Sequence, residues 1–128
     1  MTQEDKELLL KDLCTRLPYG VKVCCNKKVY NIDAYTKSAF MLAESLKPDV
    51  CLVAHIEDIK PYLFPMTSMT EEQKKEMRSF DPFQTEETKT LGQWAVHLVD
   101  FYNKYHFDYR GLIEKSLALD ATNLGIYE

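Results

Sequence analysis

The chain has 128 residues, of which 45% are hydrophobic and 28% charged. This balance is typical of a single globular domain over residues 1–128 and excludes a disordered segment. The net charge of −4 argues against a general nucleic-acid-binding protein, because phosphate binding needs a basic surface. No apolar run approaches the roughly 18 residues of a membrane span, and the acidic start does not suit a secretory signal, so we expect a cytoplasmic protein.

The chain opens with a predicted amphipathic helix. Thr2 can cap its first turn, and Pro18 and Gly20 end it. Leucines at helical spacing form its apolar face, namely Leu9, Leu10, Leu13 and Leu17.

Strands are predicted next. The apolar, β-branched stretches 21–25 and 29–32 are separated by a short turn and predict a hairpin. Residues 35–46 fit two interpretations: their apolar spacing and propensity suit a helix, whereas 39–43 also suit a strand that extends the hairpin into a meander. Residues 50–56 are short, apolar and β-rich, which predicts a buried strand.

The second half is predicted to be mainly helical. The prolines of residues 60–66 argue against regular structure there. A capping box at 70–73 starts a polar helix, apolar spacing predicts a stronger helix over 91–105, and Asp108 can cap a last short one. We therefore expect an α+β fold with an N-terminal helix, a small antiparallel sheet of three to four strands, and C-terminal helices packed on that sheet.

The cysteines and histidines show no metal-binding pattern. Cys51 and His55 share one face of the predicted strand but lie about 13 Å apart along it, too far to bind one ion. Neither a nucleophile elbow nor a glycine-rich phosphate loop is present in the sequence. We assign no catalytic, metal-binding or cofactor-binding residue and expect no cofactor. Without an export signal we expect reduced thiols at all four cysteines, Cys14, Cys24, Cys25 and Cys51.

The first candidate binding segment is residues 60–66, with the sequence KPYLFPM. If its large apolar side chains are exposed, they form a patch of the kind that marks a protein interface. The alternative is that the segment inserts them into the core. The simplest partner would be a second copy in a homodimer. The candidate contact residues are Tyr62, Leu63, Phe64 and Met66.

The second candidate segment is residues 101–110, FYNKYHFDYR, in which aromatic residues alternate with basic ones. Aromatic rings stack on bases and cations hold phosphates, so an exposed segment of this kind could bind single-stranded nucleic acid through Lys104, His106 and Arg110. The alternative is that its aromatic side chains continue the buried face of the preceding helix.

Three stretches resemble an uncharacterised family of small proteins from gut anaerobic bacteria and their phages or mobile elements. They are TQEDKELLLKDLCTRLPYGVKV at 2–23, IKPYLFPMTSMTEEQ at 59–73 and HFDYRGLIEKSLALDA at 106–121. The resemblance implies an accessory product of mobile DNA and carries no known activity. It also favours a strand over a helix within 35–46.

The sequence therefore favours a non-catalytic accessory or protein-interaction domain of a bacterial or mobile-element protein. A nucleic-acid-associated protein of a mobile element is the first alternative. An enzyme of unrecognised type is the second alternative.

Overall fold

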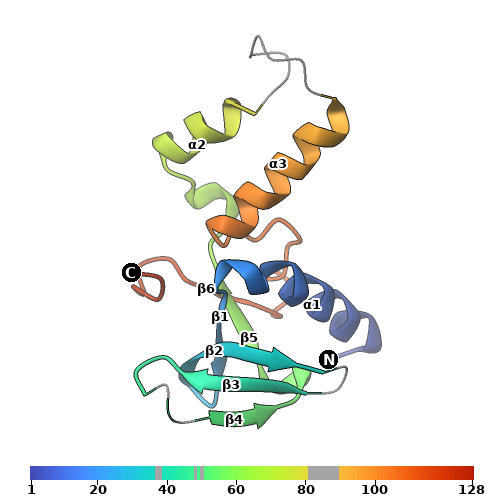
Figure 1. Cartoon of the computed structure of the whole chain (residues 1–128), viewed down its shortest axis with the longest axis vertical. Coiled ribbons are helices and arrows are strands. Elements are labelled where there is room, and N and C mark those ends of the chain that lie inside the picture. Colours follow the sequence, from blue (N-terminus) through green and yellow to red (C-terminus); the bar gives the residue numbers. More distant parts are fainter. Residues whose placement is uncertain (37–38, 48, 50, 81–89) are drawn as a thin grey trace.

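The computed structural model of the chain consists of a sheet with helix α1 (Gln3–Arg16) against one face and a pair of helices beyond it (Figure 1). This architecture confirms the predicted α+β class. Within the described residues no helix is both long and apolar enough to cross a membrane. The structure describes residues 1–36, 39–47, 49, 51–80 and 90–128.

Helix α1 forms where the sequence predicts it. The Thr2 hydroxyl accepts a hydrogen bond from the Asp5 amide at 3.1 Å, and the Asp5 carboxylate accepts one from the Thr2 amide at 3.2 Å. This capping box satisfies amides that the first helical turn leaves unpaired. Gly20, at φ +70°, turns the chain back after the helix. Leu9 and Leu13 are fully buried against the sheet.

The described residues form a six-stranded sheet in the order β4-β3-β2-β1-β5-β6. All neighbours are antiparallel except β5 and β6, which run parallel. The prediction of three to four antiparallel strands was therefore too small, because β5 and β6 come from segments without a β pattern. The strands are β1 Lys22–Cys25, β2 Lys28–Tyr35, β3 Phe40–Glu44, β4 Cys51–Ala54, β5 Lys60–Leu63 and β6 Leu119–Asp120.

The ambiguous stretch 35–46 contains a strand, β3, and not the alternative helix. Phe40 and Leu42 are buried and Met41 is half exposed, the alternation that a strand requires. Because β3 is hydrogen-bonded to β2 on one side and to β4 on the other, pairing overrides the local helix propensity. Of the predicted elements, residues 37, 38 and 50 lie outside the described residues.

Strand β5 corrects the prediction that residues 60–66 lack regular structure. Pro61 lies opposite Val23 of β1, while pairing with β6 begins one residue later, at Tyr62. A proline cannot donate to a sheet ladder. It is tolerated here because the pairing with β6 does not include it.

The last predicted helix does not form, and the chain instead makes a series of turns after α3. The Asp108 carboxylate accepts hydrogen bonds from the amides of Leu112 at 2.8 Å and Ile113 at 2.9 Å. Gly111 and Ser116 both have positive φ, which breaks a helix. Asp108 thus caps a turn that carries Leu112 into the core.

Helices α2 (Glu71–Arg78) and α3 (Leu91–Lys104) lie at the end of the molecule opposite strands β2–β4 (Figure 1). They form an aromatic cluster separate from the core of the sheet. The prediction of C-terminal helices packed on the sheet was wrong in this respect, since the described residues of α2 and α3 contribute nothing to the core of the sheet. The buried members of the cluster are Met69, Phe101 and Phe107.

Within the described part of the chain, three short 3-10 helices connect the longer elements. They are η1 Leu17–Tyr19, η2 Ile56–Asp58 and η3 Met66–Ser68.

Candidate functional site

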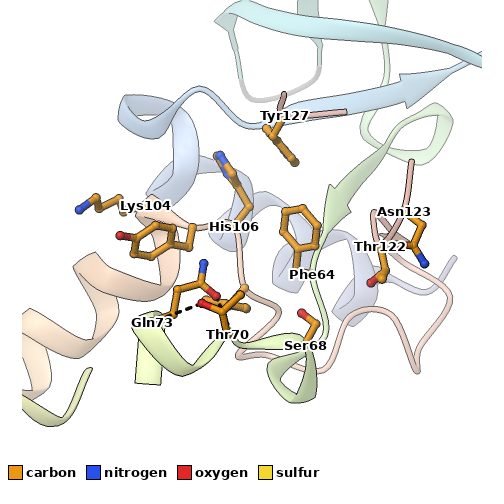
Figure 2. Close-up of a pocket in the computed structure, with 11 residues that line it drawn as sticks. Phe64, Ser68, Thr70, Gln73, Lys104, His106, Thr122, Asn123 and Tyr127 are labelled. Atoms are coloured by element: carbon orange, nitrogen blue, oxygen red, sulfur yellow. Dashed lines mark hydrogen bonds between the residues drawn. The ribbon is translucent and has the colours of Figure 1, made fainter. Parts of the chain in front are cut away.

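The two segments singled out in the sequence lie side by side. The Phe64 amide donates to the His106 carbonyl at 2.8 Å, and the Asp108 amide donates to the Phe64 carbonyl at 2.9 Å. These bonds form a short parallel bridge between Phe64 and Phe107. The C-terminal segment after β6 closes a third side (Figure 2).

The three segments and the start of α2 enclose a cavity of about 420 Å³, which we call the His106 pocket. It opens between the helical pair and the sheet. Its lining residues are Phe64, Ser68, Thr70, Gln73, Lys104, Tyr105, His106, Phe107, Thr122, Asn123 and Tyr127.

Aromatic rings form the walls of the His106 pocket. The imidazole of His106 stacks on the ring of Tyr127, with centroids 3.7 Å apart and planes within 10°. Phe64 lies on the Tyr127 ring at 5.9 Å, tilted by 48°. The rings of Tyr105 and Phe107 are 6.3 Å apart. Rings at these separations leave flat, apolar surfaces toward the cavity.

His106 is held in an unusual state. It is only 8% exposed, has φ +61°, and its Nδ1 has no hydrogen-bond partner among the described residues. Burial, together with the positive charges of Arg16 and Lys22, lowers the pKa of His106 to about 4. The imidazole is therefore neutral at pH 7. A strained backbone and an unsatisfied buried nitrogen are features that cluster at binding sites.

Tyr127 anchors the C-terminal segment across two strands. Its hydroxyl donates to the Tyr62 carbonyl of β5 at 2.6 Å and accepts from the Lys22 amide of β1 at 3.0 Å. Burial raises the pKa of Tyr127, so the phenol stays protonated. The sequence does not indicate this residue as part of a site, because nothing in the local pattern around 127 predicts a contact so distant in the chain.

The rim of the His106 pocket is polar but carries little free charge. Glu76 accepts from the Tyr105 hydroxyl at 2.6 Å and pairs with the Lys104 ammonium at 3.4 Å. The Tyr105 hydrogen bond and the Lys104 charge lower the pKa of Glu76. On the other side, the capping box of α2 occupies two side-chain oxygens. The Thr70 hydroxyl accepts from the Gln73 backbone amide, and the Gln73 side-chain carbonyl accepts from the Thr70 backbone amide. The Gln73 amide nitrogen points into the space below His106 (Figure 2).

A buried charge cluster supports the floor of the pocket. Arg16 and Asp12 are fully buried and joined at 2.7 Å, and Arg16 also donates to the Phe107 carbonyl at 2.6 Å. The ring of Tyr109 lies between two guanidiniums, 5.0 Å from Arg16 and 5.1 Å from Arg110. The cluster ties α1 to the backbone that carries His106.

The predicted partner-contact residues divide between core and pocket. Tyr62 and Leu63 are buried in β5 and cannot form a surface patch. Phe64 is half buried and lines the His106 pocket, and Met66 is 36% exposed beside it. The alternative that the segment inserts into the core therefore holds for its first half.

The predicted nucleic-acid-contact residues also divide. Lys104 and His106 line the pocket, but His106 is neutral and Lys104 is paired with Glu76. Arg110 lies outside the pocket, directed inward to Asp12 at 3.3 Å.

No protein-family model matches this chain, and no curated protein or solved structure matches it.

Hydroxyl, amide, ammonium, imidazole and aromatic side chains line the His106 pocket. None of its described lining residues is a cysteine or a carboxylate, and the Ser68 hydroxyl donates to the Pro65 carbonyl at 2.6 Å. A nucleophile with a positioned base is the minimum for covalent catalysis. The described residues also contain no group of three or more His, Cys, Asp or Glu that could hold a metal ion. Cys14, Cys24 and Cys25 are free thiols, and Cys51 lies exposed on β4.

Proposed function

We propose that this chain is a non-catalytic protein-binding domain that receives a side chain of its partner in the His106 pocket. The observation that carries the proposal is the convergence of two apolar segments, joined at Phe64 and His106, on a cavity of about 420 Å³. Pockets with aromatic walls and a few polar groups are where interfaces concentrate their binding energy.

The electrostatics favour a protein partner over a nucleic acid. The chain carries a net charge of −4, and the cation at the pocket rim, Lys104, is already paired with Glu76. Nucleic-acid binding gains most of its affinity from free cations on phosphates. A nucleic acid could therefore stack its bases on Tyr105 and His106, but the pocket would offer no free cation to bind its phosphates.

The resemblance of residues 2–23, 59–73 and 106–121 to proteins of mobile elements supports a biological context for this binding role. It favours an accessory product of mobile DNA that acts in the bacterial cytoplasm. A second copy of the chain is one partner that the proposal admits.

Partner capture from cells of the native host tests the proposal. Thr122 is exposed on the pocket rim, so Thr122→Arg should fill the mouth without disturbing the core. The matched control is Thr36→Arg, an exposed threonine at the far end of β2. We expect the wild-type chain and Thr36→Arg to capture the same protein in nuclease-treated extract, and Thr122→Arg to lose it.

Two outcomes of this experiment would contradict the proposal. Equal capture by Thr122→Arg and Thr36→Arg would remove the pocket from the interface. Capture that disappears on nuclease treatment would favour the nucleic-acid alternative instead.

A further inference from the structure

We infer that the side chain received by the His106 pocket is an aromatic ring that carries a neutral hydrogen-bonding group, a tyrosine or a tryptophan of the partner. This inference rests on the proposed function and names the chemistry that the pocket selects.

The walls of the pocket favour a flat ring over a branched aliphatic group. His106, Tyr127 and Phe64 form a continuous series of rings with centroids 3.7 and 5.9 Å apart. Tyr105 and Phe107, which also line the pocket, provide two more rings at 6.3 Å. Aromatic pairs gain free energy beyond simple area burial when rings meet offset or edge to face. A ring inserted into the pocket would make such contacts with its walls.

The polar atoms of the pocket favour a ring with a hydrogen-bonding group. The Gln73 amide nitrogen points into the space below His106, and Thr122 and Asn123 stand at its edge (Figure 2). A buried polar atom left without a partner is unfavourable. A phenol or an indole can supply hydrogen bonds there, whereas a phenylalanine or leucine side chain would leave these groups desolvated and unpaired.

The charges of the pocket exclude an anionic group on the ligand. Lys104 is paired with Glu76, and His106 is neutral. No described lining residue is an arginine. A phosphate or carboxylate in the pocket would lose its hydration without gaining a free cation. The ligand group is therefore neutral.

The fold already holds one tyrosine in this manner. The Tyr127 ring stacks on His106, while its hydroxyl bonds backbone groups of Lys22 and Tyr62. His106 thus serves as an aromatic platform beside polar groups that accept a phenol. The partner residue would use the same combination from the open side of the pocket.

Nuclear magnetic resonance titration of the full chain tests the inference with side-chain analogues. The probes are p-cresol, 3-methylindole, toluene and phenyl phosphate, each added to the wild-type chain and to the variants Thr122→Arg and Thr36→Arg. We expect p-cresol and 3-methylindole to shift the amides of Gln73, His106 and Phe107 in a saturable way. Toluene should bind about fivefold more weakly, because it lacks one hydrogen bond. Thr122→Arg should abolish binding and Thr36→Arg should retain it.

Several outcomes would overturn the inference. Equal or tighter binding of toluene would show that hydrogen bonding is not selected, and tighter binding of phenyl phosphate would show an anion site. Absence of binding by every probe would also overturn it. The proposed function would survive each result if Thr122→Arg still abolished partner capture, so the two failures can be told apart.

Discussion

At the scale of single residues, His106 concentrates the features of the site. Its carbonyl accepts a hydrogen bond from the Phe64 amide, its ring stacks on Tyr127, and its Nδ1 has no hydrogen-bond partner among the described residues. Histidine adopts positive φ more readily than most residues, but the position still carries a conformational cost. A residue held in this way, at the centre of a cavity, is better explained by binding than by stability.

The neutral state of His106 makes stability depend on pH. Its pKa is about 4 in the folded chain, below the ordinary value of 6.5, so the unfolded chain binds more protons between these two values. The free energy of unfolding should therefore fall as pH drops through this window, by about 3 kcal/mol in all. Titration of the imidazole resonances and denaturation at several pH values would measure both effects.

The control for this prediction is His106→Asn, because asparagine also tolerates positive φ and does not titrate. This variant should lose the pH-dependent contribution between pH 4 and 6.5. A His106 pKa near 6.5 would contradict the account.

The buried pair of Arg16 and Asp12 leads to a second prediction at this scale. Arg16→Met should lower the free energy of unfolding by about 3–5 kcal/mol, because it leaves a buried carboxylate without its closest cation. Arg110→Met is the matched control: Arg110 contacts the same carboxylate at 3.3 Å but is partly exposed, so the loss should be smaller. Chemical denaturation measures both. Equal losses would show that Arg16 has no special role.

At the scale of elements, the sequence predicted the helix caps and the hairpin turn, which residues close together in the chain form among themselves. The capping residues Thr2 and Thr70 bond as expected, and the two positive φ values at Asn26 and Lys27 form the tight turn of the predicted hairpin. Strand β5 was not predictable in this way, because its partner strands are far away in the chain. The turn after Asp108 is local, but an aspartate that accepts from following amides also suits the start of a helix, so the sequence did not distinguish the two. The strand β3 was predicted only as one of two alternatives.

The same distinction applies to the candidate site. The sequence indicated Phe64, Lys104 and His106, since these residues belong to conspicuous apolar or aromatic stretches. It could not show that they share one cavity, because the bridge between Phe64 and Phe107 joins positions more than 40 residues apart. It also missed Tyr127, whose hydrogen bonds and ring contacts are made with residues far away in the chain.

The C-terminal segment provides a prediction at the scale of elements. Tyr127→Phe removes the hydroxyl that bonds to Lys22 and Tyr62, and should lower the free energy of unfolding by about 1–2 kcal/mol. Hydrogen exchange at the Lys22 amide should accelerate. The control is Tyr19→Phe, whose exposed hydroxyl bonds to Asp100 at 3.3 Å and should contribute little. Unchanged exchange at Lys22 in Tyr127→Phe would contradict this anchoring role.

At the scale of the whole molecule, the His106 pocket lies where two cores meet. The sheet with α1 forms one core, and α2 with α3 forms an aromatic one. The bridge from Phe64 to Phe107 and the contact from Arg16 to the Phe107 carbonyl connect them. A ligand in the pocket would touch the aromatic core and the C-terminal segment, whose Tyr127 is hydrogen-bonded to β1 and β5 (Figure 2). Binding should therefore stabilise the arrangement of the three parts.

The role of the His106 pocket is tested most directly by the affinity of the purified chain for the protein that it captures. We expect Thr122→Arg to raise the dissociation constant by at least about tenfold, the effect of losing one pocket contact of about 1.4 kcal/mol, and Thr36→Arg to leave it unchanged. Equal affinities of the wild-type chain and Thr122→Arg would contradict a protein-binding role for the His106 pocket.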